Sequence, residues 1–297
     1  MKVATITLFC NEGFRLEAWK QYYSEYRDDI ALHVIVNNGN PSDTALLRES
    51  FPDSLVIESD SPNMMYSYNL ALREILKDQD VDTVGQIVND IRIERGGIRR
   101  LWETLFSQED FFAVSPLLLR KDSETIDCFG CRIKRENYRL IHMDVDTSSE
   151  DVPKEVRMVD ALPAGIIFAK RCYYERLGFQ DESIYMYADE IDLGIKVAGR
   201  SLKMVATSYV KAWHQHQFKD ASTGAHSNPL AAYYIGRNAV YLARKYDSVF
   251  RVARVFLHHV FGGMDVWRSA FFHNKKDGSY AFGWAMIKGA FNGLTHK

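Results

Sequence analysis

The chain has 297 residues, of which 46% are hydrophobic and 26% are charged, and its formal net charge is −2. This composition is that of an ordinary globular protein with a sizeable core, and the absence of a global basic field argues against a nucleic acid as partner. No segment approaches ~18 consecutive apolar residues and the first residues lack a signal-peptide pattern, so we expect a cytoplasmic protein that does not span a membrane.

Apolar and amphipathic segments alternate through the first part of the chain. Residues 3–9 (VATITLF) are β-branched and apolar, as in a buried strand, and a turn signal at 37–41 ends the similar segment 31–36. Strands alternating with helices predict βαβ units and an α/β fold with a Rossmann-like, mostly parallel central sheet flanked by helices. The expected strands are 3–9, 31–36, 55–58, 83–88 and 111–115, and the expected helices are 16–26, 44–50, 65–77 and 98–106.

Residues 120–158 are polar and irregular, and we expect an excursion from the sheet there, with a hairpin near 128–140. Cys128 and Cys131 form one CxxC pair in this region. A structural zinc site needs four ligands and no second pair is nearby, so the sequence does not predict zinc. The four cysteines of the chain are few enough to fit a reducing compartment.

The second half returns to strands and then becomes helical. We expect strands at 164–169, 202–206 and 209–214, helices at 170–177 and 191–198, and a mostly helical chain from Pro229 onward. The chain is therefore divided into an α/β domain, residues 1–220, and a helical C-terminal extension, residues 221–297.

Polar residues follow two of the predicted strands, Asn37-Asn38 after the second and Asn89-Asp90 after the fourth. Ligands of open α/β sheets bind beyond the carboxyl ends of the strands. The sequence therefore predicts a ligand site at this edge of the sheet.

Several segments carry a resemblance when they are taken in order. The chain reads CNE at 10–12, VIVNNGN at 34–40, NMMYSYN at 63–69 and IVND at 87–90. It continues with LGFQDE at 177–182, YMYADEIDL at 185–193, WHQH at 213–216, YY and RN within 233–238, and KG and GL within 288–294. In this order and spacing the segments resemble family 2 glycosyltransferases with the GT-A fold, of the rhamnosyltransferase-like and galactofuranosyltransferase-like subgroup.

The resemblance implies an inverting transfer of a sugar from a UDP- or dTDP-sugar to a hydroxyl group of a glycan or lipid-linked acceptor, in surface polysaccharide synthesis. The leaving diphosphate must be neutralised, which the resemblance assigns to Mn²⁺ or Mg²⁺. The acceptor hydroxyl needs a general base, and the nucleotide needs a fixed cradle.

The metal is assigned to Asp90 and His214. Asp90 ends an apolar strand, and a hard cation prefers such an oxygen, although Val88-Asn89-Asp90 lacks the first acid of a DxD motif. His214 matches the late histidine of the family, and an imidazole suits Mn²⁺ better than Mg²⁺. His216 is the alternative ligand. The structural alternatives are a turn cap for Asp90 and a surface position for either histidine.

The base is assigned to the acidic cluster Asp189, Glu190 and Asp192 at the start of a helix. Acids in a first turn also cap a helix and favour its dipole, but three within four residues exceed what a cap requires. Close carboxylates repel, so one pKa should rise toward the range of a base. By position Glu190 is the base and Asp189 supports it. The family order is swapped here, so the roles can reverse.

The donor cradle is assigned to the first strand end, the turn after the second strand and several later residues. The family has Asp where this chain has Asn37, whose amide oxygen can still accept from the N3–H of uracil or thymine but without charge assistance. The predicted donor-binding residues are Leu8, Cys10, Asn11, Asn37, Asn38, Gly39, Asn63, Asn69, Asn89 and Arg237.

Residues 249–272 mix large apolar side chains with Arg251 and Arg254. The segment fits an interfacial amphipathic helix pair, broken at Gly262-Gly263. Packing onto the α/β domain or a homo-oligomer interface is the favoured interpretation. Attachment to the inner face of the membrane is the alternative, which a lipid-linked acceptor, as the resemblance implies, would support.

Two other functions are weighed against an active transferase. A non-catalytic nucleotide-sugar or glycan-binding subunit of an assembly complex would explain the missing DxD acid and Asn37. A nucleotidyltransferase should show a Gly-rich, basic phosphate loop near the N-terminus, and residues 8–15 lack one.

Overall fold

The computed structural model describes residues 1–215, 228–272 and 279–296. The chain forms two compact units. The first comprises Met1–Arg132, His142–Glu182 and Leu193–His216, and the second comprises Ile133–Ile141, Ser183–Asp192 and Gln217–Lys297. The predicted domain boundary at 220/221 lies outside the described residues.

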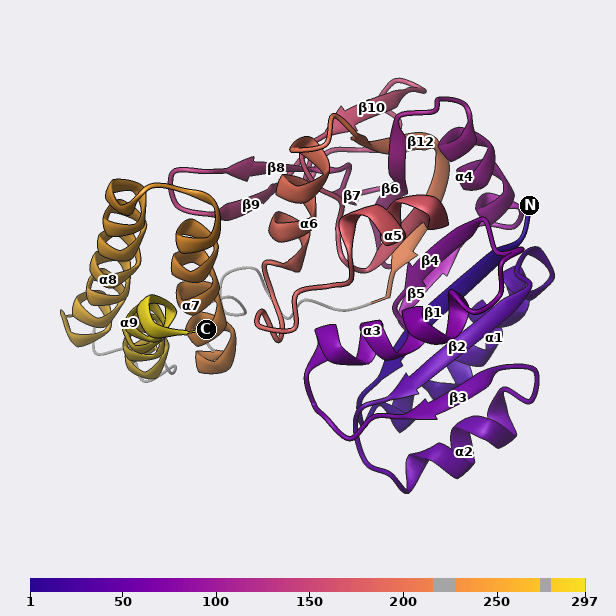
Figure 1. Ribbon diagram of the computed structural model, residues 1–297, viewed down its shortest axis with the longest axis horizontal. Helices are drawn as coiled ribbons and strands as arrows, with labels where there is room; N and C mark the ends of the chain where they lie inside the picture. Colours follow the sequence, from indigo (N-terminus) through magenta and orange to yellow (C-terminus); the bar gives the residue numbers. More distant parts are fainter. Residues whose placement is uncertain (216–227, 273–278, 297) are drawn as a thin grey trace. The chain divides into compact units, whose positions relative to one another are not determined.

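The first unit is built on a large mixed sheet (Figure 1). The strands formed by the N-terminal part of the chain are apolar and buried, as their β-branched sequences predict. They are β1 (Val3–Phe9), β2 (Leu32–Asn37), β3 (Leu55–Glu58), β4 (Thr83–Ile87) and β5 (Ile91–Ile93). The later strands of the sheet are β6 (Phe111–Arg120), β7 (Ile126–Cys128), β10 (Val156–Val159), β11 (Ile166–Lys170) and β12 (Lys203–His214).

The strand order is β10-β12-β6-β11-β4-β1-β2-β3, with β5 beside β12 and β7 beside β6. The β1, β2, β3 and β4 strands pair in parallel, which confirms the predicted βαβ half. Beyond β4 the sheet is mixed, because β11 is antiparallel to both of its neighbours while β12 runs parallel to β6. The predicted hairpin near 128–140 is confirmed as β8 (Cys131–Lys134) and β9 (Arg139–His142).

Helices flank this sheet (Figure 1). An apolar stripe on the first helix buries Trp19 and Tyr23, which pack with Phe51 around the buried His33. Asn63 caps the third helix by accepting from the amides of Met65 and Tyr66. The helices of the first unit are α1 (Leu16–Tyr26), α2 (Asp43–Ser50), α3 (Met64–Ile75), α4 (Gly97–Phe106) and α5 (Arg171–Leu177), and α6 (Asp189–Ala198) begins in the second unit and ends in the first.

The second unit contains the predicted helical extension, α7 (Pro229–Tyr246), α8 (Val249–Phe272) and α9 (Ser279–Thr295), together with the β8–β9 hairpin. Glycines let these helices cross closely, since a Cβ added to Gly289 would lie 2.0 Å from the carbonyl oxygen of Tyr233. A Cβ added to Gly283 would lie 2.5 Å from the carbonyl oxygen of Gly263. Within the described residues, no helix combines the length and the apolar character needed to cross a bilayer.

Candidate active site

The first part of the site lies at the carboxyl ends of the parallel strands, where the sequence predicts it. Asn37 and Asn38 end β2, and Asn89 and Asp90 follow β4. The β5–β12 ladder pairs Ile91 with His214, and the carbonyl oxygen of Asp90 accepts from the amide of Gln215 at 2.7 Å. Strand register thus brings the end of β12 to Asp90.

Asp90 and His214 meet there, as predicted from the sequence. The Nε2 atom of His214 lies 3.6 Å from Oδ1 of Asp90. Two ligand atoms about 2.1 Å from one ion lie about 3.0 to 3.4 Å apart in octahedral or tetrahedral geometry. A carboxylate oxygen and an imidazole nitrogen at this separation fit one divalent ion after a small movement, and together they suit Mn²⁺. His216 lies outside the described residues.

Asp127 holds His214 in position, and the sequence did not single it out. Its Oδ2 atom lies 3.1 Å from Nδ1 of His214. A carboxylate on one imidazole nitrogen places the proton there and leaves the lone pair of the other nitrogen for a metal. A metal bound beside Asp90 would take the lone pair of Nε2 of His214 in that tautomer. No local sequence pattern marks Asp127, which is half-buried on β7 between the buried Ile126 and Cys128.

Arg15 supplies a cation beside Asp90. Its Nη1 atom lies 2.5 Å from Oδ2 of Asp90 and 3.6 Å from Oε1 of Glu12. Glu12 also accepts from the side-chain amide of Asn89 at 2.5 Å. Arg15 therefore neutralises one carboxylate oxygen of Asp90, while the other oxygen faces His214. Neither Arg15 nor Glu12 was among the predicted site residues.

The turn after β2 is held by Asn37 and Asn11. The side-chain nitrogen of Asn37 donates to the carbonyl oxygen of Asn40 and to Oγ1 of Thr44, and its oxygen accepts from the amide of Gly39. Asn11 has a φ of 58° and accepts from the amide of Asn40 at 2.7 Å. The amide of Asn37 thus has protein partners, so its contact with a nucleotide base stays a prediction.

One feature of this turn still suits a ligand. Gly39 itself serves packing within the protein, because an added Cβ would be 2.6 Å from the side-chain oxygen of Asn11. Asn38 is buried, and its side-chain oxygen has no hydrogen-bond partner among the described residues. A buried acceptor without a partner is costly, and a donor group of a ligand would satisfy it. Leu8 lies at the end of β1, and Cys10 follows that strand and is exposed.

Asn63 and Asn69 hold the chain that leads out of the first unit. Asn63 donates to the carbonyl oxygen of Glu182 at 2.7 Å while it caps α3. Asn69 donates to the carbonyl oxygen of Gln180 and to Oε1 of Glu182, and accepts from the amide of Gln180. These contacts give both asparagines a positioning role, and their predicted contact with the donor remains untested.

The acidic cluster begins in the second unit, directly after a strained loop. Tyr185, Tyr187 and Ala188 have φ values of 66°, 60° and 66°, which residues other than glycine rarely adopt. Such strain persists only where the surroundings impose it, and it concentrates at functional sites. The loop delivers the chain to Asp189, the first residue of α6.

Arg237 and Asn238 of α7 impose this loop conformation. The Nη2 atom of Arg237 donates to the carbonyl oxygens of Ser183 and Ile184, both at 2.6 Å. Asn238 donates to the carbonyl oxygens of Ile184, Met186 and Tyr187. Both side chains are buried rather than a surface pair. Arg237 thus positions the acidic cluster, and its predicted contact with the donor stays a prediction.

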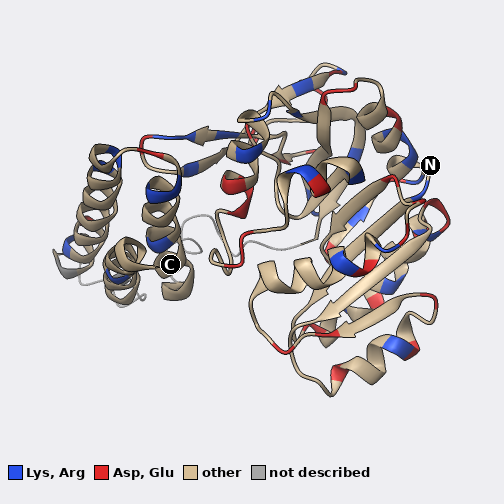
Figure 2. Ribbon diagram, in the orientation of Figure 1, with Lys and Arg blue, Asp and Glu red and all other residues tan. Residues whose placement is uncertain are grey.

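The three acids of the cluster differ in their surroundings. Asp192 is 1% exposed and accepts from Lys245 Nζ and from the hydroxyl of Tyr246, both at 2.7 Å, which gives it a structural role. Burial, and then the charge of the adjacent Glu190, raise the pKa of Asp189 well above its usual range. Glu190 itself is half-buried, so of the three it is the acid that a substrate can reach. Figure 2 shows these acids as red segments at the start of α6.

Asp90 and His214 belong to the first unit, whereas the acidic cluster belongs to the second. The approach of the cluster to the Asp90–His214 pair therefore remains a prediction from the sequence. The structure pairs Asp90 with His214 and its neighbour Asp127 in the first unit, and it holds the acidic cluster behind a strained loop in the second unit.

Known structures share this fold. The chain matches a solved structure of GalNAc-T7 with UDP, GalNAc and Mn²⁺ with a TM-score of 0.64 and 13% identity, over 99% of this chain and 58% of that one. It matches mannosyltransferase PcManGT from Pyrobaculum calidifontis, in complex with GDP-Man and Mn²⁺, with a TM-score of 0.57 and 14% identity, over 99% and 87% of the two chains. No family model and no curated protein matches the sequence. The predicted GT-A fold is thus confirmed.

Proposed function

We propose that the protein is a metal-assisted glycosyltransferase. The observation that carries the proposal is the Asp90–His214 pair, with Asp127 behind the histidine, at the ligand-binding edge of a GT-A sheet. The two structural neighbours were solved with Mn²⁺ and with UDP or GDP-Man. Asp90 and His214 would hold the same kind of ion, which when bound neutralises the charge of the departing diphosphate.

Glu190 is proposed as the general base. It would take the proton of the acceptor hydroxyl as the oxygen forms a bond to the anomeric carbon, while the bond from that carbon to the diphosphate oxygen breaks. Attack from the face opposite the leaving group inverts the anomeric centre. Asp189, which keeps its proton to a higher pH than an exposed aspartate, can donate a hydrogen bond to Glu190 and hold it in place.

We further propose a UDP- or dTDP-sugar as donor and a glycan or lipid-linked acceptor in surface polysaccharide synthesis, as in the rhamnosyltransferase-like enzymes of family 2. The support is the motif order in the sequence together with the turn at Asn37–Gly39. The uncharged Asn37 in place of an aspartate leaves the choice between the two pyrimidine bases to experiment.

The test is donor hydrolysis and transfer with a panel of UDP-, dTDP- and GDP-sugars, with and without Mn²⁺. We expect one donor to be hydrolysed with Mn²⁺ and not after chelation. Binding of a donor without turnover would instead favour the alternative function, a non-catalytic nucleotide-sugar-binding subunit. Turnover that is insensitive to chelation would overturn the metal assignment.

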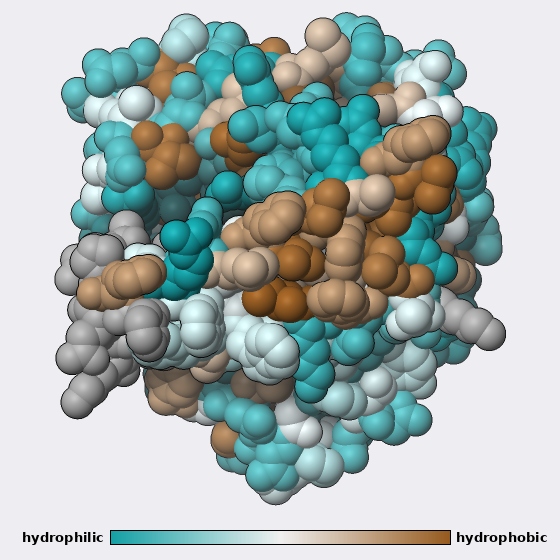
Figure 3. Space-filling model, turned by 90° about the vertical axis from the view of Figure 1, so that its left-hand side faces the viewer, coloured by the Kyte–Doolittle hydropathy of each residue, from teal (hydrophilic) through white to brown (hydrophobic). Residues whose placement is uncertain are grey.

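The acceptor side of the proposal includes contact of the second unit with a lipid surface. Figure 3 shows hydrophobic side chains gathered in a continuous patch on one face of the molecule. Several large apolar and aromatic side chains on α8 and α9 are at least 36% exposed. They include Phe250, Leu257, Phe261, Met264, Trp267, Tyr280, Trp284 and Phe291.

Charge favours an anionic bilayer as the occupant of this patch. The two helices carry four basic residues, Arg251, Arg254, Arg268 and Lys288, and one acid, Asp265. Figure 2 shows α8 and α9 as mostly uncharged ribbons with a few blue segments. Exposed aromatic side chains combined with basic ones are typical of helices that lie in a membrane interface.

Flotation with phosphatidylserine-containing vesicles tests the membrane contact. Each large apolar side chain contributes at least about 1.5 kcal/mol on burial, so replacing both Phe261 and Trp284 by Glu should weaken binding about 100-fold. Met158→Glu, at an exposed site on β10, is the matched control. Wild-type protein that stays out of the vesicle fraction and elutes as a dimer would assign the patch to self-association instead.

A further inference from the structure

A second cluster of ligating side chains lies outside the proposed active site. Cys128 ends β7 and Cys131 begins β8, and the two residues between them form a tight turn with Gly130 at a φ of 79°. A Cβ added to Gly130 would lie 2.4 Å from Cγ1 of Val159, so this turn requires glycine. The turn brings the two sulfur atoms to 3.5 Å from each other.

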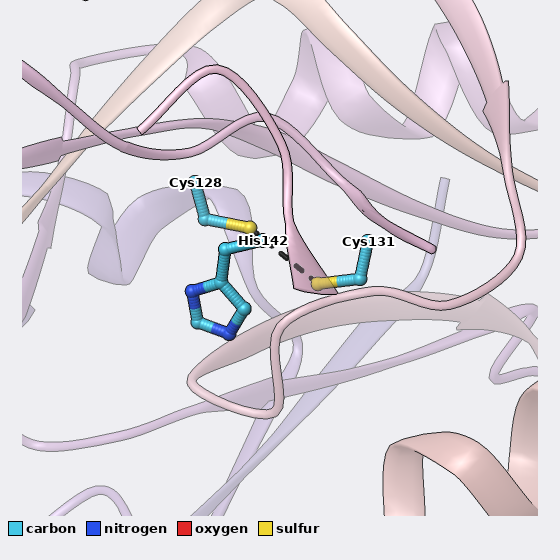
Figure 4. A group of neighbouring side chains, drawn as sticks. All are labelled: Cys128, Cys131 and His142. Carbon is cyan, nitrogen blue, oxygen red and sulfur yellow. Dashed lines mark hydrogen bonds between the residues drawn. The ribbon is translucent and has the colours of Figure 1, made fainter. Parts of the chain in front are cut away.

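His142, at the end of β9, completes the cluster. The amide of Phe129 donates to the carbonyl oxygen of Met143, and the amide of Met143 donates to the carbonyl oxygen of Gly130. These two bonds fix the chain at 142–143 against the cysteine turn. The two sulfurs and one imidazole nitrogen all lie within 4.8 Å of one another, and Figure 4 shows the sulfurs pointing toward each other beside the imidazole ring.

The distances fit a metal better than a disulfide. A disulfide requires sulfurs about 2.0 Å apart. Two thiolates bound at about 2.3 Å to one tetrahedral zinc ion are about 3.8 Å apart, close to the 3.5 Å observed.

The burial of the cluster also favours a metal. Both cysteines are fully buried and His142 is exposed, so an ion bound here would have protein sulfurs on the inside and solvent on the outside.

The chemistry of the three ligands selects the ion. Two thiolates and an imidazole suit Zn²⁺, whereas Mn²⁺ and Mg²⁺ prefer carboxylate and water oxygens. This cluster therefore differs in metal preference from the Asp90–His214 pair. Three protein ligands leave the fourth tetrahedral position for a water molecule on the exposed side.

We propose that Cys128, Cys131 and His142 bind one Zn²⁺ ion, which clasps the two ends of the β8–β9 hairpin. Cys131 and His142 are the first and last residues of that hairpin, and residues Ile133–Ile141 between them belong to the second unit. Binding releases the thiol protons to solvent and transfers no electrons. The ion also anchors the end of β7, the strand that carries Asp127.

Cobalt titration of the reduced full-length chain tests this site, because Co²⁺ takes the place of Zn²⁺ and its thiolate complexes absorb in the near ultraviolet. We expect one Co²⁺ per chain, a thiolate charge-transfer band, and loss of the band when Zn²⁺ is added. Cys131→Ser should weaken Co²⁺ binding by more than about 100-fold, beyond the 10–100-fold cost of changing a residue that only orients a ligand. Cys10→Ser and Cys172→Ser, which change exposed cysteines, should keep the band.

His142→Ala guards against a folding artefact, since His142 is exposed and its loss should leave the fold intact. This variant should keep its circular dichroism spectrum and bind Co²⁺ more weakly, with an altered band. The proposal is overturned if the reduced wild-type chain gives no thiolate–cobalt band, or if Cys131→Ser and His142→Ala bind Co²⁺ as the wild type does. The outcome is independent of Mn²⁺-dependent donor hydrolysis.

Discussion

Replacing Asp127 by Asn tests the metal assignment through a residue that is not itself a ligand. Oδ2 of Asp127 lies 3.1 Å from Nδ1 of His214, so it fixes the imidazole with its Nε2 lone pair toward Asp90. Removing a carboxylate that orients a histidine ligand costs 10–100-fold in metal affinity. We therefore expect the Mn²⁺ concentration for half-maximal donor hydrolysis to rise by about 10–100-fold.

The assay is a Mn²⁺ titration of donor hydrolysis at saturating donor, with turnover at saturating Mn²⁺ measured in parallel. Asp53→Asn is the matched control, because Asp53 forms an exposed ion pair with Arg27 on the first unit. A purely structural role for Asp127 would lower turnover at all Mn²⁺ concentrations and leave the midpoint unchanged. An unchanged midpoint in Asp127→Asn would refute His214 as an oriented metal ligand.

Three other predictions concern the base, the loop and the core. Glu190→Gln should lower transfer by at least about 100-fold while nucleotide binding, measured by calorimetry, stays near wild type; a variant with most of its turnover would remove Glu190 from that role. Arg237→Lys should lose part of the hydrogen bonding to the carbonyl oxygens of Ser183 and Ile184. It should reduce kcat by up to about 100-fold and leave the KM for the donor little changed. An effect on the donor KM alone would instead favour a direct contact of Arg237 with the donor. Burial lowers the pKa of His33 to about 3, so below pH 6.5 the unfolded chain binds a proton at His33 that the folded chain does not. The folded state therefore loses stability as the pH falls from 6.5 toward 3. Between pH 7 and pH 4 this loss is about 3 kcal/mol in the free energy of unfolding, and a His33→Asn variant measured by urea unfolding should lack it.

The first half of the fold follows closely from the sequence. Segments such as 3–9 are apolar and β-branched throughout, so the strand type and its burial can both be predicted. The turn at Asn37 and the carboxylate of Asp90 follow from the rule that polar residues at parallel strand ends gather at one edge. The mixed order beyond β4 is not readable in the same way, because β11 inserts between strands that are far from it in the sequence.

Contacts that depend on strand register could not be predicted from the sequence. Asp127 reaches His214 only because β7 and β12 both flank β6, and nothing local marks that aspartate. The CxxC pair could not be assigned to a metal from spacing alone, because its third ligand, His142, arrives through the β8–β9 hairpin. The positive φ values at Tyr185, Tyr187 and Ala188 were equally hidden, since no glycine marks them and the loop is imposed by Arg237 and Asn238.

The central claim is that Asp90 and His214 hold one divalent ion at the departing diphosphate, and that Glu190 acts as the general base at the same site. The most direct measurement is a crystal structure of the protein with Mn²⁺ and UDP, with the ion located by its anomalous scattering. The account predicts that the anomalous peak lies between Asp90 and His214, that the UDP diphosphate contacts the ion, and that Glu190 faces the donor site. Mn²⁺ bound elsewhere, or Glu190 on a face of the protein remote from the diphosphate, would contradict it.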